Sequence, residues 1–339
     1  MYVVQWSPVT EALQPANLDS KQRIFAVLVL GLCATSVGAL LADLYGLMPM
    51  DQFARWVTGP GLLLLIALAS RTVPSYENLQ RRIRLGAVAG VAGTIAYDVF
   101  RIPFALAGQR IFAPIFSYGL LIDGGGMSSP WTDLLGWLFH LSNGVTFGIA
   151  YAVVMAGRHW GFGILWGVLL EAVAFLGPFT EVYGLTGKWL SIGIAFAAHV
   201  AYGLPLGLMV FKFTTTERFL KQSLFRPALI VLGISVVGLT LWHRPWSDPT
   251  TLDRAQEIAA DAGQPVAVVV VERFQPEWLR VEPGECVLLV NESPESFNSD
   301  FGALPADDRA EWCFTDPGVE RIKLNDRPYS GGFVFVNER

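Results

Sequence analysis

Seven long apolar stretches restrict the fold of this chain more than any other feature. A helix needs about 20 mostly apolar residues to cross roughly 30 Å of hydrocarbon. We therefore expect a multi-pass helical membrane protein of about seven spans, whose partner over residues 23–244 is the lipid bilayer. The expected spans are approximately 23–45, 54–70, 84–105, 131–156, 160–178, 188–211 and 226–243.

Two apolar segments fit this pattern less well. The stretch 54–70 is short and places Pro60 between two glycines, which weakens it as a span. The segment "IFAPIFSYGLLI", residues 111–122, is too short to cross a bilayer. We expect it to be an interfacial or re-entrant helix.

The distribution of basic residues predicts the orientation. Eleven lysines and arginines lie in the N-terminal flank and in the loops after the second, fourth and sixth spans, whereas the opposite loops hold three. Lysine and arginine are retained on the cytoplasmic side of a membrane. We therefore expect residues 1–22 to be cytoplasmic, the C-terminal part to be extracytoplasmic, and the protein to lie in the cytoplasmic (inner) membrane of a bacterial-type cell.

The last 95 residues have a different composition. Residues 245–339 carry 18 acidic and 8 basic side chains, a net charge of −10. Such a surface repels phosphates, so we expect no nucleic-acid partner. A linker and short helix are expected at 245–264. Residues 265–339 then contain about seven short strands rich in valine and phenylalanine, separated by turn residues, which predicts an all-β sandwich.

The strand order in this region resembles a known family. The segments "FQPEWLRVEPGECVLLVNE", "FTDPGVERIKL" and "GGFVFV" are similar in order and texture to the cupredoxin family, a Greek-key sandwich in which many members bind type 1 copper. Such a copper centre needs two histidines and a cysteine thiolate. Residues 245–339 contain no histidine and no methionine, and the family's ligand positions fall near Glu295 or Ser296, near Leu324 and near Arg327. The resemblance therefore implies a copper-free sandwich that serves structure or contact with a protein partner on the extracytoplasmic side.

The resemblance also bears on two cysteines. In cupredoxin-like topology the strands that carry Cys286 and Cys313 are neighbours, and the compartment outside the cytoplasmic membrane is oxidising. We expect a disulfide between them that contributes ~3 kcal/mol. The alternative is a pair of buried free thiols, because cysteine is often buried without a partner.

A short motif recurs in the membrane part. The sequence "HLSNGVTFG" at 140–148 returns as "HVAYGLPLG" at 199–207. Residues four apart share one helix face, and glycines on that face let helices approach closely. Four expected helices carry such stripes, each with one ionisable residue in line. The stripes are Gly86, Gly90, Thr94 and Asp98; His140, Gly144 and Gly148; Gly163, Gly167 and Glu171; and His199, Gly203 and Gly207.

The ionisable residues Asp98, His140, Glu171 and His199 are expected in the middle-to-outer half of the bilayer. An ionisable group near the bilayer centre costs about 3 kcal/mol unless it is paired or hydrated, so such residues are candidates for function. A structural interpretation is equally open. In it, Asp98 pairs with Arg101, and each histidine bonds a neighbouring glutamate, tyrosine or backbone carbonyl.

Three functional interpretations follow from the same four residues. Two imidazoles and two carboxylates suit a divalent transition metal such as Zn, Fe or Mn, bound by His140, His199, Glu171 and Asp98. Alternatively, His140 and His199 ligate a b-type haem in a membrane-bound oxidoreductase. A third interpretation is a proton or ion path in a transporter. We favour a binding or accessory membrane component, and the sequence assigns no catalytic residue.

Overall fold

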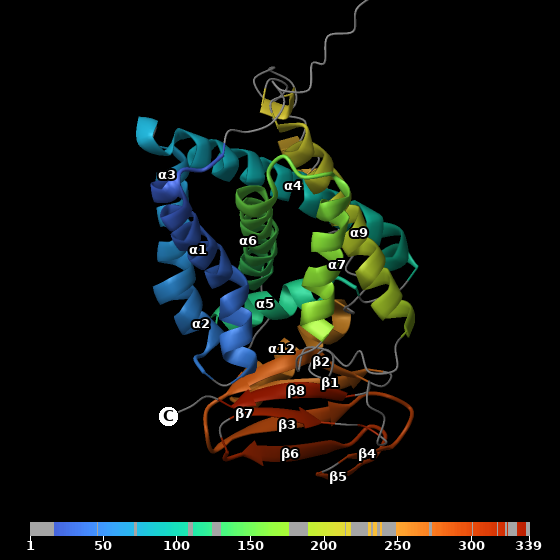
Figure 1. Ribbon diagram of the computed structural model, residues 1–339. Coiled ribbons are helices and arrows are strands. Elements are labelled where there is room, and N and C mark those ends of the chain that lie inside the picture. The colour runs from blue at the N-terminus through green and yellow to red at the C-terminus, as the bar shows by residue number, and fades with distance from the viewer. Residues whose placement is uncertain are drawn as a thin grey trace, which may run out of the picture.

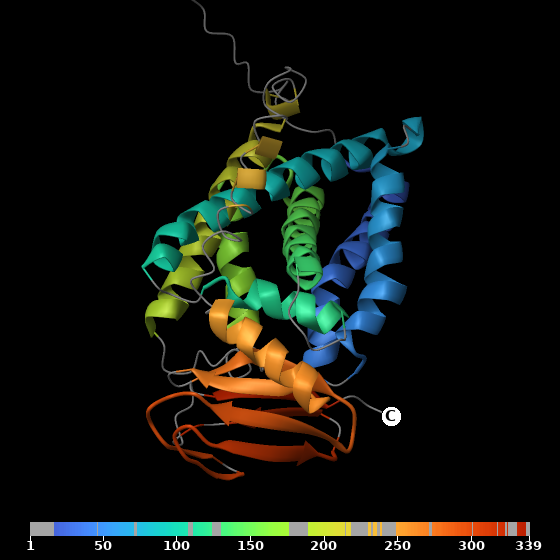
Figure 2. The ribbon, with the colours of Figure 1, turned by 180° about the vertical axis from the view of Figure 1, so that it is seen from behind.

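The computed structural model is described below for most of the chain. The described residues are 17–45, 47–70, 73–107, 111–123, 130–175, 189–213, 215–217, 230–231, 233–235, 238, 249–270, 273–299, 301–316, 318–322, 324 and 331–336. They form a bundle of apolar helices followed by a strand-rich domain (Figures 1 and 2).

Five helical segments among these residues are long and apolar enough to cross a membrane, so the chain is a membrane protein. They are Ser20–Leu44, Met50–Ser70, Pro74–Leu106, Pro130–Met155 and Trp189–Phe211. The expected fifth span is a shorter helix, α7 (Gly161–Phe175), in the described residues. The expected seventh span, 226–243, falls mostly outside them. The predicted count of seven is therefore not confirmed.

The second span begins earlier than its sequence suggested. Helix α2 (Met50–Phe53) continues through a π-helical segment, η2 (Ala54–Thr58), into α3 (Gly59–Ser70). The side chain of Met50 is fully buried, and its backbone N–H donates to Oδ1 of Asp43 at 2.7 Å. The π-helical turn ends just before the first residues of α3, where Pro60 has no N–H to donate. This arrangement extends the segment to a length that can span.

The core of the bundle is built from two antiparallel helix pairs. Helix α4 (Glu77–Leu106) packs on α6 (Pro130–Met155), and α7 packs on α9 (Trp189–Phe211). Helix α4 also packs on α9 and so joins the two pairs, while α1 (Ser20–Leu44) packs on the other side of α6. The short 3-10 helix η3 (Pro74–Tyr76) leads into α4.

Glycines form the contact within each pair. A β-carbon added at Gly90 would overlap the backbone of Gly144, and one added at Gly203 would overlap the backbone of Gly163. The backbones are therefore in direct contact, as the repeated stripes predicted.

Helix α5 (Ala113–Asp123) is 11 residues long and lies across the end of the bundle that faces the strands (Figure 1). It is held against α6, because a β-carbon at Gly119 would overlap the carbonyl of Thr132. It also contacts α2 and, in the C-terminal domain, strand β2. The predicted short, non-spanning helix thus lies between the bundle and the strands.

The C-terminal region has eight strands in its described residues. They are β1 (Val266–Val270), β2 (Arg273–Val281), β3 (Glu285–Asn291), β4 (Phe297–Ser299), β5 (Gly302–Leu304), β6 (Arg309–Phe314), β7 (Gly318–Ile322) and β8 (Gly331–Val336). Six of them follow the order β6-β3-β1-β2-β8-β7, and β4 pairs with β5. The pairs β1–β3 and β2–β8 are parallel, whereas β1–β2, β3–β6 and β7–β8 are antiparallel.

Strand β2 lies between β1 and β8 in this sheet. Its first residues, Arg273–Gln275, pair with β1, while Arg273 and, after a register shift, Trp278–Val281 pair with β8. Side chains from both halves meet in one core that includes Val287, Phe297 and Val334. The amphipathic helix α12 (Pro249–Ala262) covers β1 and β3 from outside through Ala255 and Ile258.

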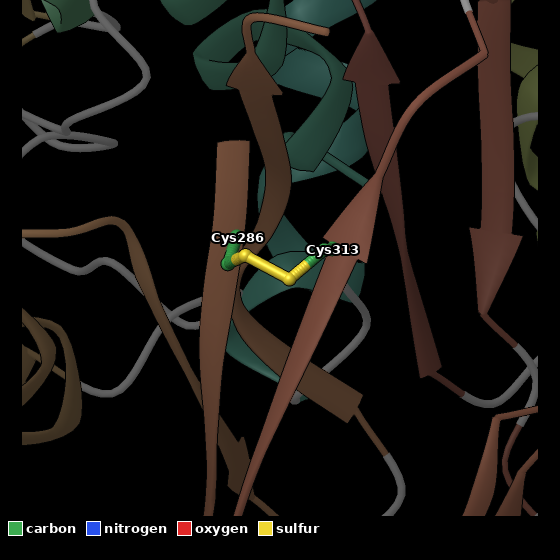
Figure 3. Close-up of a disulfide and its surroundings, with 2 residues drawn as sticks. All are labelled: Cys286 and Cys313. Atoms are coloured by element: carbon green, nitrogen blue, oxygen red, sulfur yellow. A yellow bond between two sulfur atoms is a disulfide. The ribbon is translucent and has the colours of Figure 1, made fainter. Parts of the chain in front are cut away.

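The two cysteines of this region form a disulfide. Cys286 on β3 and Cys313 on β6 are directly opposite in the antiparallel ladder, and their sulfur atoms are bonded (Figure 3). The expected cross-strand disulfide is confirmed, and the alternative of two buried free thiols is wrong.

Candidate functional site

The four predicted ionisable residues lie in the bundle as two carboxylate–imidazole pairs. Nε2 of His140 is 3.1 Å from each carboxylate oxygen of Asp98. Nδ1 of His199 is 3.1 Å from Oε2 of Glu171 and 2.9 Å from the carbonyl oxygen of Ala195. Each pair joins two helices, α4 with α6 and α7 with α9.

The glycine contacts bring these pairs together. Asp98 follows Gly90 by two turns of α4, and His140 precedes Gly144 by one turn of α6. The two helices are antiparallel and touch at these glycines. The side chains of Asp98 and His140 therefore meet just past the point where the backbones are in contact. Glu171 likewise follows Gly167 by one turn of α7, and a β-carbon added at Gly167 would overlap the backbone carbonyl of His199. In both helix pairs, the repeated spacing thus places a carboxylate–imidazole contact next to a contact between glycines.

Arg101 balances the charge of the first pair. Its Nη2 is 3.6 Å from Oδ1 of Asp98, and its Nη1 donates to the hydroxyl of Tyr97 at 3.0 Å. The guanidinium carbon lies 4.4 Å from the ring centroid of Tyr97 and 4.2 Å from that of Phe112. Both Asp98 and Arg101 are buried, 2% and 6% exposed. The structural interpretation is thus met for the pair Asp98–Arg101 and for His199, whereas His140 contacts Asp98 instead of a glutamate, a tyrosine or a backbone carbonyl.

Tyr97 connects the two pairs, which sequence reasoning did not predict. Its ring centroid is 5.8 Å from that of His140 and 4.9 Å from that of His199. The signal in the sequence was its position beside Asp98, but adjacent residues on a helix do not share a face, so the stripe pattern did not include it.

A cavity of about 670 Å³ lies beside these residues. It is lined by twenty residues from α1, α4, α5, α6, α7 and α9, among them Tyr97, His140, Glu171 and His199. Asp98 stands behind His140, outside the lining. Most of the remaining wall is aliphatic or aromatic. A mainly apolar cavity of this size with a few convergent polar groups is typical of small-molecule sites.

Two polar atoms at this cavity have no partner among the described residues. Oδ1 of Asn143 and Nε1 of Trp166 are buried and make no hydrogen bond, and both residues line the cavity. A third polar residue, Tyr202, donates its hydroxyl to the carbonyl of Gly144 at 2.8 Å. Asn143 follows His140 by one turn, so the helical period could have included it. A buried acceptor and a buried donor without partners point to a ligand that supplies them.

The predicted metal ligands do not form one compact set. Among the described residues, the group of three whose ligand atoms lie within 4.8 Å of one another is Cys286, Glu311 and Cys313, and its sulfurs are joined in the disulfide. The pairs Asp98–His140 and Glu171–His199 remain separate. Each imidazole nevertheless keeps one ring nitrogen that does not face its carboxylate.

Comparison with known proteins identifies neither a family nor a function for this chain. No family model and no curated protein matches the chain. Two solved structures of amicyanin variants are similar to it. An oxidised variant is 20% identical over 22% of this chain and 83% of the amicyanin, with a TM-score of 0.20. A reduced variant is 19% identical over 22% of this chain and 84% of the amicyanin, also with a TM-score of 0.20. Amicyanin is a cupredoxin, so this weak similarity concerns the strand-rich region and extends to no function.

Proposed function

We propose that this chain is a membrane-embedded binding protein whose bundle holds a small ligand against His140, His199 and Glu171. The observation that carries the proposal is that these residues, which come from three helices, line one cavity of about 670 Å³. Ionisable groups at membrane depth are costly unless they are paired or meet a ligand. Here they are paired, and they also face a space large enough for a ligand.

The strand domain has an accessory role in this proposal. We place it outside the cytoplasmic membrane, without copper, where it docks a protein partner. The excess of lysine and arginine in alternate loops and the disulfide between Cys286 and Cys313 support this placement. Alkaline phosphatase fused after residue 339 is expected to be active, and green fluorescent protein fused at the same position is expected to be non-fluorescent. The reverse result would place the domain in the cytoplasm.

A bound metal or haem is the second candidate. One observation favours it. Metal-bound histidines usually hold their other ring nitrogen against a carboxylate, and both His140 and His199 do so here. In this version Asp98 and Glu171 orient the imidazoles, which themselves provide the ligand atoms. A haem would supply redox chemistry to an oxidoreductase. Ion or proton transport stays a prediction that these contacts do not test.

The test uses full-length protein purified without metal-affinity resin. Native mass spectrometry, elemental analysis and an absorption spectrum are recorded for the wild type, for His140→Ala/His199→Ala, and for the control His159→Ala. His159 is exposed and lies outside the cavity lining. The proposal expects a bound organic molecule, a stoichiometric metal or a haem band in the wild type and control, and its loss in the double variant. A wild-type protein that retains none of these would overturn it.

A further inference from the structure

We propose that the cavity binds a neutral, lipid-soluble molecule with a flat, oxygen-bearing ring, of the quinone or quinol class, and admits it from the bilayer between α1 and α7. This inference rests on the proposed function of the cavity and specifies its ligand. Four observations carry it: the position of the opening, the charges in the wall, the rings in the wall and the two unpartnered polar atoms.

The edge of the cavity is apolar and exposed. Leu41 and Tyr45 line it from the end of α1 and are 40% and 57% exposed. Leu169 and Val173 line it from α7 and are 50% and 64% exposed. Both helices are apolar, and α1 is long enough to span a membrane. Side chains of this kind at membrane depth face hydrocarbon, so a ligand that passes them comes from the lipid phase.

The charges in the wall oppose an anionic ligand. Glu171 lines the cavity and Asp98 stands behind His140. No lysine or arginine is among the lining residues in the described part of the chain. The nearby guanidinium of Arg101 lies outside the lining, between the rings of Tyr97 and Phe112. Its Nη2 is 3.6 Å from Oδ1 of Asp98, whose charge it balances, although its Nε and Nη2 make no hydrogen bond among the described residues. A fatty acid or a phospholipid head would therefore bring negative charge to a wall that cannot neutralise it.

The rings and the unpartnered atoms favour a flat head with oxygens. Eight of the twenty lining residues carry aromatic or imidazole rings, and such surfaces pack well on another planar ring. Nε1 of Trp166 can donate to a carbonyl oxygen, and Oδ1 of Asn143 can accept from a hydroxyl. A quinone offers the first of these partners and a quinol offers both. The aliphatic wall of α1 and α7 then contacts the tail.

The experiment compares three tritiated probes on the full chain in phosphatidylcholine nanodiscs. Decylubiquinone has a neutral ring, decanoate an anionic head and decylamine a cationic head. We expect saturable binding of decylubiquinone at least about tenfold tighter than that of the other two. Asn143→Leu should weaken this binding up to about tenfold, the loss expected for one hydrogen bond. Thermal unfolding of each variant in the same nanodiscs identifies variants that fail to fold.

The proposed opening between α1 and α7 is tested by placing bulky side chains in it. Leu41→Trp/Val173→Trp should slow association of decylubiquinone, whereas the matched control Leu63→Trp should not. Leu63 is 68% exposed on α3 and is not in the cavity lining. Equal or tighter binding of decanoate or decylamine would overturn the neutral-head inference, and unchanged association in the double variant would overturn the opening. If no probe binds while a metal or haem is retained, this inference fails and the proposed function stands. If nothing is retained, both fail.

Discussion

Nε2 of His140 lies 3.1 Å from both carboxylate oxygens of Asp98, and the two residues stand on antiparallel helices whose glycines are in contact. Glu171 and His199 form the corresponding pair on α7 and α9, where Nδ1 of His199 faces Oε2 of Glu171. In each pair a smooth glycine surface brings two backbones together, and a carboxylate–imidazole contact lies where the surface ends. The motif is therefore both a packing device and the means by which polar groups reach the cavity.

Asp98 is expected to matter more for stability than an exposed acidic residue does. Asp98→Asn removes the charge that faces buried Arg101, and loss of one partner from a buried pair costs about 3 kcal/mol. The matched control is Glu217→Gln, since Glu217 pairs with Arg81 where both are part-exposed, a contact that contributes at most about 1 kcal/mol. Unfolding in bicelles by titration with dodecyl sulfate measures both. Equal losses would show that Arg101 does not depend on Asp98.

The glycine contacts predict a sharp response to one added methyl group. Gly90→Ala and Gly203→Ala would each push a β-carbon into a backbone carbonyl of the facing helix. We expect each to destabilise the bundle by about 1–3 kcal/mol. Gly31→Ala on α1 is the control, because a β-carbon there meets nothing within 4 Å. Thermal unfolding in detergent micelles compares the three. Alanine is the better helix former, so a loss at Gly31 as large as at Gly90 would mean that the contact between backbones does not set the effect.

Much of this arrangement was predictable from period and composition. Residues four apart share a helix face, so the stripes identified the contact surfaces and the ionisable residues at their ends. The cysteine pairing followed from the resemblance of the strand order to cupredoxins. The four-residue spacing indicates which side chains share a helix face, and the order of the strands indicates which cysteines are neighbours.

Other features depend on contacts that no local pattern encodes. The partner of each imidazole and the contacts of Tyr97 with both imidazole rings follow from how α4, α6, α7 and α9 pack on one another. The second span starts at Met50 because Oδ1 of Asp43 accepts a hydrogen bond from the backbone N–H of Met50. Asp43 belongs to α1 and lies outside the apolar stretch 54–70 from which the second span was predicted. Asn143 and Trp166 are candidates for ligand binding only because the structure places them in the cavity wall with polar atoms that lack hydrogen-bond partners.

Tyr202 tests how the cavity wall is held. Its hydroxyl donates to the carbonyl of Gly144, and its ring lies against Gly93 of α4. Tyr202→Phe keeps the ring and loses one hydrogen bond, which should cost about 1 kcal/mol. Tyr202→Ala also removes the packing and should cost about 3–5 kcal/mol. Unfolding by dodecyl sulfate titration measures both variants. Nearly equal losses would mean that the ring packing contributes little.

The disulfide is expected to stabilise the strand domain alone. Cys286 and Cys313 close a loop with a sequence separation of 27, for which chain entropy gives about 3 kcal/mol. Cys286→Ser/Cys313→Ser should therefore lower the melting temperature of the strands and leave the helical transition unchanged. Circular dichroism of the full chain at strand and helix wavelengths follows both. Cys33→Ser, a buried free thiol on α1, is the control and should affect the helices instead. Two free thiols at 286 and 313 in non-reducing mass spectrometry would contradict the bond itself.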